Sequence, residues 1–170
     1  RVAALGYAMP GAVIAIGVLV PLGRLDNWLA AVLEDGFGVR MGLLFTGTLA
    51  ALVYACLVRF LAVALQTTEA GLARITPSME DAARSLGASP VAALARVHAP
   101  LIAPSLASAA LLVFVDVMKE LPATFALRPF NFDTLAIEAY NLAKDERLAE
   151  AAVPSLVIVL VGLVPLLALT

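Results

Sequence analysis

A short charged segment separates two long apolar runs, and it reads Thr76-Pro77-Ser78-Met79-Glu80-Asp81-Ala82-Ala83-Arg84-Ser85-Leu86-Gly87-Ala88-Ser89-Pro90 before continuing to Val97-His98-Ala99-Pro100. Thr76 followed by Pro77 is typical of a helix start, because a proline in the first turn loses no hydrogen bond. Gly87 can adopt the left-handed conformation that ends such a helix. We therefore expect a short helix from Pro77 to just before Gly87.

A second helix is predicted directly after this turn. Ser89 and Pro90 repeat the cap-then-proline signal, and we expect this helix to end near Pro100. The first helix carries an apolar stripe at spacings of three, four and seven, formed by Met79, Ala82, Ala83 and Leu86. Residues 76–100 thus predict two helices meeting at a glycine, with a stripe of partly small residues that a partner could approach closely.

The spacing resembles the EAA signature of the membrane-spanning permease subunits of binding-protein-dependent ABC importers. The family pattern is Glu-Ala-Ala, three residues, Gly, nine residues and Ile-x-Leu-Pro. Here the matching residues are Asp81-Ala82-Ala83, Gly87 and Val97-x-Ala99-Pro100. Asp replaces Glu, Val replaces Ile, and Ala replaces Leu. Glu80 directly precedes the signature, so which of the two acids takes the family's role stays open.

The resemblance implies a type I importer permease in a bacterial inner membrane, with residues 76–100 as a cytoplasmic coupling helix-turn-helix. In such permeases this element fits a groove of the ATPase subunit, where the acid pairs with a basic residue. That role falls to Asp81 or Glu80, and close packing falls to Ala82, Ala83 and the turn at Gly87. The implied partners are a dimer of ATPase subunits, a second permease half on the same chain or an identical copy, and a periplasmic or lipoprotein solute-binding protein.

The composition independently indicates a protein surrounded by membrane lipid. Apolar residues make up 62% of the chain against about 45–50% in ordinary domains, and charged residues 14% against about 25%. The net charge of -2 provides no basic footprint for nucleic acid. Cys56 is the only cysteine and His98 the only histidine, so neither an internal disulfide nor a histidine-based metal site is expected. No cofactor is indicated.

Hydropathy predicts an all-α, polytopic helical bundle, and the resemblance implies that residues 1–170 form one partial permease domain. Four apolar runs are long enough to cross a bilayer, at residues 2–23, 41–65, 101–118 and 151–170. Pro10 is expected to kink the first span, and Arg59 to reach the headgroups from near the end of the second. Because the chain begins at Arg1 and stops inside an apolar run, we expect a longer polypeptide.

Two polar segments connect the spans away from the signature. Residues 24–40 are predicted as a short polar connection, and residues 119–150 as a periplasmic helical loop. Pro122 and Pro129 favour an irregular start to this loop, which could belong to a gate, and Asp133-Thr134 can cap a following helix. Positive charges are balanced between the two sides, so the resemblance alone places 76–100 in the cytoplasm.

The chain lacks the Gly-x-x-x-x-Gly-Lys-Ser/Thr loop that cradles nucleotide phosphates, so we expect a non-catalytic transport subunit driven by a partner. The stretch 121–136 resembles the ferric-iron branch of these importers, while thiamine, polyamine and other small-solute branches share the fold. Asp116 and Glu120 are candidate pathway carboxylates; alternatively they only pair with Lys119 or Arg128. A membrane-embedded enzyme and a passive channel are the alternative classes.

Overall fold

A computed structural model describes residues 6–40 and 42–168, and this part of the chain is helical without a strand. The predicted span ends at residues 2–5, 41 and 169–170 lie outside the described residues. The helices are α2 (Gly11–Phe37), α3 (Leu49–Leu72), α4 (Pro77–Ser85), α5 (Pro90–Ala93), the π-helix η1 (Leu94–His98), α6 (Ala99–Met118), α7 (Pro122–Leu127), α8 (Leu135–Lys144) and α9 (Leu148–Ala168). The predicted helical class is confirmed.

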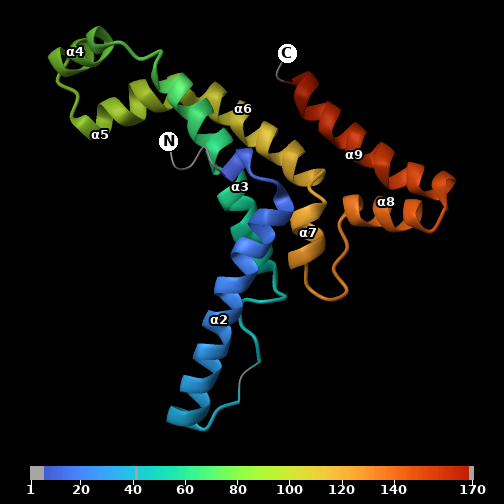
Figure 1. The fold of residues 1–170 in the computed structure, drawn as a ribbon. Helices are drawn as coiled ribbons and strands as arrows, with labels where there is room; N and C mark the ends of the chain where they lie inside the picture. The colour runs from blue at the N-terminus through green and yellow to red at the C-terminus, as the bar shows by residue number, and fades with distance from the viewer. Residues whose placement is uncertain (1–5, 41, 169–170) are drawn as a thin grey trace.

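The helices are arranged around α3, which contacts α2, α6 and α7. Figure 1 shows α4 and α5 together at one end of the molecule, while the long α2 extends toward the opposite end. The chain continues from α5 through η1 into α6 without leaving the helix, and α8 packs along α9. The signature segment thus lies at one extremity, joined directly to a long apolar helix.

Within the described residues, three helices are long and apolar enough to cross a membrane: Gly11–Phe37, Leu49–Leu72 and Pro90–Met118. A fourth, shorter apolar helix covers Leu148–Val164, within α9. The multi-pass helical architecture expected from hydropathy is therefore confirmed, although the helix boundaries differ from those predicted.

The first boundary to differ is that of α2. The polar connection predicted at 24–40 is wrong for most of its length, because α2 begins directly after Pro10 and continues to Phe37. The helical path is interrupted at Pro10 as expected, since residues 6–8 are helical whereas Met9 and Pro10 are not. A proline has no N–H to donate, so it fits immediately before a first turn without distorting the helix. Gly38, with a φ of 65°, ends α2 in the left-handed conformation.

The second boundary shifts because a buried carboxylate holds the connection between α2 and α3. Asp26 is only 2% exposed, and its oxygens accept the backbone N–H groups of Leu44, Phe45 and Thr46 at 2.7–3.2 Å. Amides bonded in this way cannot belong to a helical ladder, so α3 begins at Leu49 and not near residue 41. The connection is consequently folded back against α2.

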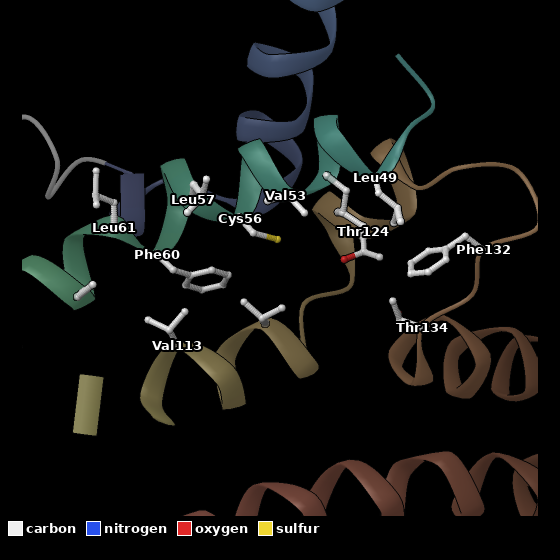
Figure 2. Close-up of a pocket in the computed structure, with 13 residues that line it drawn as sticks. Leu49, Val53, Cys56, Leu57, Phe60, Leu61, Val113, Thr124, Phe132 and Thr134 are labelled. Atoms are coloured by element: carbon white, nitrogen blue, oxygen red, sulfur yellow. The ribbon is translucent and has the colours of Figure 1, made fainter. Parts of the chain in front are cut away.

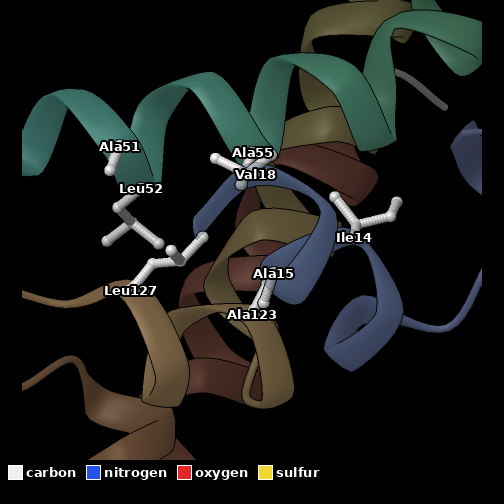
Figure 3. Packing of buried hydrophobic residues seen from close by; sticks show 8 residues of the cluster. All are labelled: Ile14, Ala15, Val18, Ala51, Leu52, Ala55, Ala123 and Leu127. Carbon is white, nitrogen blue, oxygen red and sulfur yellow. The ribbon is translucent and has the colours of Figure 1, made fainter. Parts of the chain in front are cut away.

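Small side chains bring α2, α3 and α7 into close contact. Figure 3 shows the cluster, whose buried members are Ile14, Ala15, Val18, Ala51, Leu52, Ala55, Ala123 and Leu127. Because lipid provides no hydrophobic drive for association, helices in membranes depend on such tight packing.

The prediction of an irregular stretch after Met118 is wrong in part. Pro122 is a first-turn residue of the helix α7 and so begins a helix there.

The contact between α3 and α6 is closest at Gly71. A Cβ added there would lie 2.8 Å from both Cβ and Oγ of Ser105, so only glycine fits without a shift. On α6, Ala109 is buried as well, at 4% exposure. The end of α3 next to the signature segment is therefore held tightly against α6.

The C-terminal helices follow their sequence signals more closely. The side chain of Thr134 accepts the N–H of Ile137 at 3.4 Å, which confirms the predicted cap of α8. α9 begins at Leu148, three residues before the predicted start of the last span. An ion pair between Arg147 and Glu150 lies at this helix start.

Gly71→Val is expected to destabilise the protein by about 1–3 kcal/mol, because the added methyl groups overpack the α3–α6 contact. The melting temperature of the purified protein in detergent measures this effect. Gly17→Val is the matched control, since a Cβ at Gly17 meets nothing within 4 Å. Equal melting temperatures for the two variants would contradict the packing described here.

Asp26→Ala is expected to lower the melting temperature by several degrees, because three backbone N–H groups lose their acceptor. Asp35→Ala, which removes an exposed carboxylate from the same helix, is the control and should have little effect. The same comparison by hydrogen exchange should show faster exchange at residues 44–46 only in Asp26→Ala.

Candidate functional site

The signature segment forms a compact knob, which we define as residues 76–98 and which consists of α4, the turn at Gly87, α5 and η1. Thr76 occupies the cap position of α4 with extended backbone, although its hydroxyl contacts the Ser78 hydroxyl at 2.9 Å and no backbone amide. Ser89 caps α5 by accepting the N–H of Ala92 at 3.3 Å. Both predicted helix starts are therefore present.

The turn between the two helices has the geometry of a Schellman motif. The N–H of Ala88 donates to the carbonyl of Ala83 at 3.0 Å, and the N–H of Gly87 donates to that of Arg84 at 2.9 Å. Gly87 has a φ of 82°, which a side chain would strain. Glycine at this position therefore sets the angle between α4 and α5.

The predicted second helix does not end near Pro100. It continues through η1 into α6, so that helix runs from Pro90 to Met118. In η1 the N–H of Ala99 donates to the carbonyl of Leu94, five residues earlier, which widens the helix just before Pro100. A wider turn accommodates the proline ring and its missing donor, which would otherwise break the helix.

Most of the knob's signature residues face solvent. Glu80, Asp81, Ala82 and Gly87 are exposed, whereas Ala83 is buried between the two helices at 8% exposure. Within the described part of the chain, no ion pair involves Glu80 or Asp81. The knob therefore presents two free carboxylates and an apolar tip, with Leu86 at 89% exposure.

A shallow hollow of about 400 Å³ lies on the α5 side of this tip. Its lining is formed by Ala83, Leu86, Gly87, Ala88, Ser89, Ala92, Arg96 and Val97. An exposed apolar side chain beside a small hollow is typical of a protein-binding surface. The arrangement suits a partner that covers the tip and has basic groups for the acids.

A second candidate site is a polar cavity of about 520 Å³ at the other end of α6. Its lining consists of Tyr7, Arg59, Phe60, Asp116, Lys119, Glu120 and Pro122. We refer to it as the polar cavity. The two candidate pathway carboxylates, Asp116 and Glu120, lie together in this cavity. The sequence alone could not show that they share one site.

Both carboxylates in the polar cavity are already paired. Asp116 lies 2.8 Å from the ammonium of Lys119 and accepts the hydroxyl of Tyr7 at 3.5 Å. The hydrogen bond and the charge of Asp116 raise the pKa of Lys119 above its usual value, so this cation persists at neutral pH. Glu120 is 6% exposed and accepts the N–H of Ala123 at 3.1 Å.

The partner of Glu120 was not expected from the sequence. It is Arg59, whose Nε lies 3.3 Å from Glu120 Oε2, near the middle of α3. The prediction that Arg59 reaches the headgroups from near the end of a span is therefore wrong. Arg128 pairs with Asp133, and not with Asp116 or Glu120. A positive charge inside an apolar run, with a carboxylate just beyond the next run, is the sequence signal that could have found this pair.

Gly11 makes room for the pair. A Cβ at this position would lie 2.2 Å from Arg59 Nη1 and 2.4 Å from Glu120 Oε1, so the start of α2 covers both charged groups. Nη1 is buried and has no hydrogen-bond partner among the described residues. The guanidinium also lies 5.6 Å from the ring centroid of Phe60.

An apolar cavity of about 470 Å³ lies beside the polar one (Figure 2). Figure 2 shows Phe60 of α3 and Val113 of α6 on opposite sides of it. Its polar lining groups are Cys56, Thr124 and Thr134, and the other lining side chains are apolar, so the cavity suits apolar groups. It offers no charge for a polar solute, unlike the polar cavity.

Metal-binding groups of three or more His, Cys, Asp or Glu are absent from the described residues.

Comparison with known proteins agrees with this geometry. The family described as binding-protein-dependent transport system inner membrane component matches residues 1–170. The chain is 28% identical over 159 residues to the Fe(3+)-transport system permease protein FbpB 2 of Haemophilus influenzae, covering 94% of this chain and 28% of that protein. It is 35% identical over 117 residues to the putative 2-aminoethylphosphonate transport system permease protein PhnV of Salmonella typhimurium, covering 69% of this chain and 44% of that protein. The chain therefore spans less than half the length of these relatives.

Glu120→Gln is expected to destabilise the protein by about 3 kcal/mol, because the Arg59 charge is left buried without a partner. The double variant Arg59→Gln/Glu120→Gln should regain at least about 1 kcal/mol of this loss, as a double-mutant cycle on thermal unfolding in detergent would measure. Asp116→Asn is the control with a smaller loss, since its partner Lys119 is 64% exposed. Additive effects of the Arg59 and Glu120 changes would contradict the buried pair.

Proposed function

This chain belongs to the family of binding-protein-dependent transport system inner membrane components, and we propose that it forms part of the permease of an ATP-driven importer in a bacterial inner membrane. The observation that carries the proposal is the exposed knob with two unpaired acids, joined without a break to an apolar helix. In this proposal the chain is not an enzyme, and a partner ATPase hydrolyses the nucleotide.

The knob is the proposed contact to the ATPase. Asp81, or Glu80 in its place, pairs with a basic residue of that subunit, while Ala82 and Ala83 permit close approach. Gly87 sets the angle of the two helices, and Pro100 marks the point where the signature enters the membrane helix. Two ATPase subunits, a second permease half and a solute-binding protein complete the proposed assembly.

The continuous helix from Pro90 to Met118 provides a route for mechanical coupling. Its first turns belong to the knob, and its last turn contributes Asp116 to the polar cavity. Because Gly71 and Ser105 hold α3 firmly against α6, a displacement of the knob would move both helices together. Rigid-body movement of packed helices is a common way to alternate between two open states.

Asp116 and Glu120 line the proposed solute pathway, since both border the polar cavity. Two solutes are supported by specific observations. Ferric iron is supported by the similarity to the Haemophilus influenzae permease and by the resemblance of residues 121–136 to that branch. An organic phosphonate is supported by the similarity to the Salmonella protein and by the two cations, Arg59 and Lys119, at the cavity.

Gly87→Asp and Ala83→Glu are each expected to lower the rate of ATP-driven uptake by about tenfold or more, while the permease remains in the membrane. The first strains the turn and the second forces a charge between the two helices. Uptake by cells carrying the complete importer, together with capture of the ATPase on the purified permease, measures the effect.

Gly36→Asp is the matched control, because it adds the same charge near the far end of α2, where nothing lies within 4 Å. It should retain both uptake and ATPase capture. Unimpaired uptake in Gly87→Asp and Ala83→Glu would overturn the coupling role. Uptake without any ATPase would favour a passive channel instead.

A further inference from the structure

Some hydrogen-bond donors of the polar cavity have no partner among the described residues. Both oxygens of Asp116 are engaged, one by Lys119 and one by the Tyr7 hydroxyl. Both oxygens of Glu120 are engaged too, one by Arg59 and one by the N–H of Ala123. Each acid is thus neutralised by a cation of the cavity itself, and the positive charges of Arg59 and Lys119 would repel a metal cation.

The donors are in the opposite situation. A guanidinium carries five N–H groups and an ammonium three. Arg59 forms an ion pair with Glu120 through Nε at 3.3 Å, but neither Nε nor Nη1 has a hydrogen-bond partner in the described part of the chain. Lys119 contacts Asp116, and its side chain is 64% exposed. The cations of the cavity therefore keep donors that a ligand could use.

We propose that the polar cavity receives an oxyanion group of the transported solute, a phosphonate, phosphate or carboxylate, on Arg59 and Lys119. In this assignment Asp116 and Glu120 are positioning residues that hold the two cations and do not ligate a metal ion. The assignment rests on the proposed function, because it treats the cavity as part of an import pathway.

The position of Arg59 fits this role. Its guanidinium borders the cavity while the start of α2 covers Nη1 at Gly11. In the proposed complex, a rotation of this long side chain turns Nη1 toward the ligand. An oxyanion would then complete the hydrogen bonds of a group that is otherwise unsatisfied inside the membrane, and two N–H groups of a guanidinium match two oxygens of one phosphonate.

Direct binding to the purified complete importer, without nucleotide, tests the assignment. The probes are 2-aminoethylphosphonate and inorganic phosphate, and the readout is the melting temperature as a function of probe concentration. We expect stabilisation of the wild type by at least one of the two. Arg59→Gln should raise the half-saturating concentration by about 10- to 100-fold, the loss typical of a charge-assisted hydrogen bond.

Two further variants keep the result interpretable. Arg59→Gln/Glu120→Gln leaves no buried charge unpaired, so it should remain folded and still lose the response to the probe. Arg24→Gln removes an exposed arginine of α2 outside the cavity and should respond like the wild type.

The assignment is overturned if neither probe stabilises the wild type, or if Arg59→Gln and the double variant keep the wild-type half-saturation. Uptake of ferric iron by the wild type without any response to an oxyanion would overturn it equally. Because this measurement uses no nucleotide, it is independent of the knob variants. A failure of ATPase coupling and a failure of the oxyanion site are therefore seen in different experiments.

Discussion

The charge of Arg59 near the middle of a membrane-spanning helix is the constraint on which the surrounding structure depends. In hydrocarbon such a charge has to be paired inside the protein, and Glu120 provides the partner from the segment that follows α6. The pairing requires α6 to end beside the middle of α3, and it requires the start of α2 to lack a side chain at Gly11. One ion pair therefore relates three helices to one another.

Close packing of small residues makes this arrangement possible on both sides of the pair. Toward the knob, Gly71 and Ser105 bring α3 and α6 together. On the other side, alanines of α2, α3 and α7 form the buried cluster of Figure 3. Packing of this kind is stiff, so helices that share it move as a unit. The knob and the polar cavity lie near opposite ends of the same continuous helix.

The two sites differ in what they leave unsatisfied. The knob exposes carboxylates without partners and an apolar tip, which suits a basic protein surface. In the polar cavity each acid is paired with a cation and Arg59 retains unused donors, which suits an oxyanion. This contrast separates the two acidic pairs that look alike in sequence, Glu80 with Asp81 and Asp116 with Glu120.

Hydropathy and local signals by themselves determined the helical membrane class, the caps at Ser89 and Thr134, and the glycine turn at Gly87, because each depends on neighbouring residues only. The course of the chain past Pro10, Pro100 and Pro122 was decided by tertiary structure, since a proline can equally start, widen or break a helix until its surroundings are known. The same holds for Asp26, Arg59 and Glu120. Their partners lie far away in sequence, and a buried charge reveals its role only when folding brings the opposite group beside it.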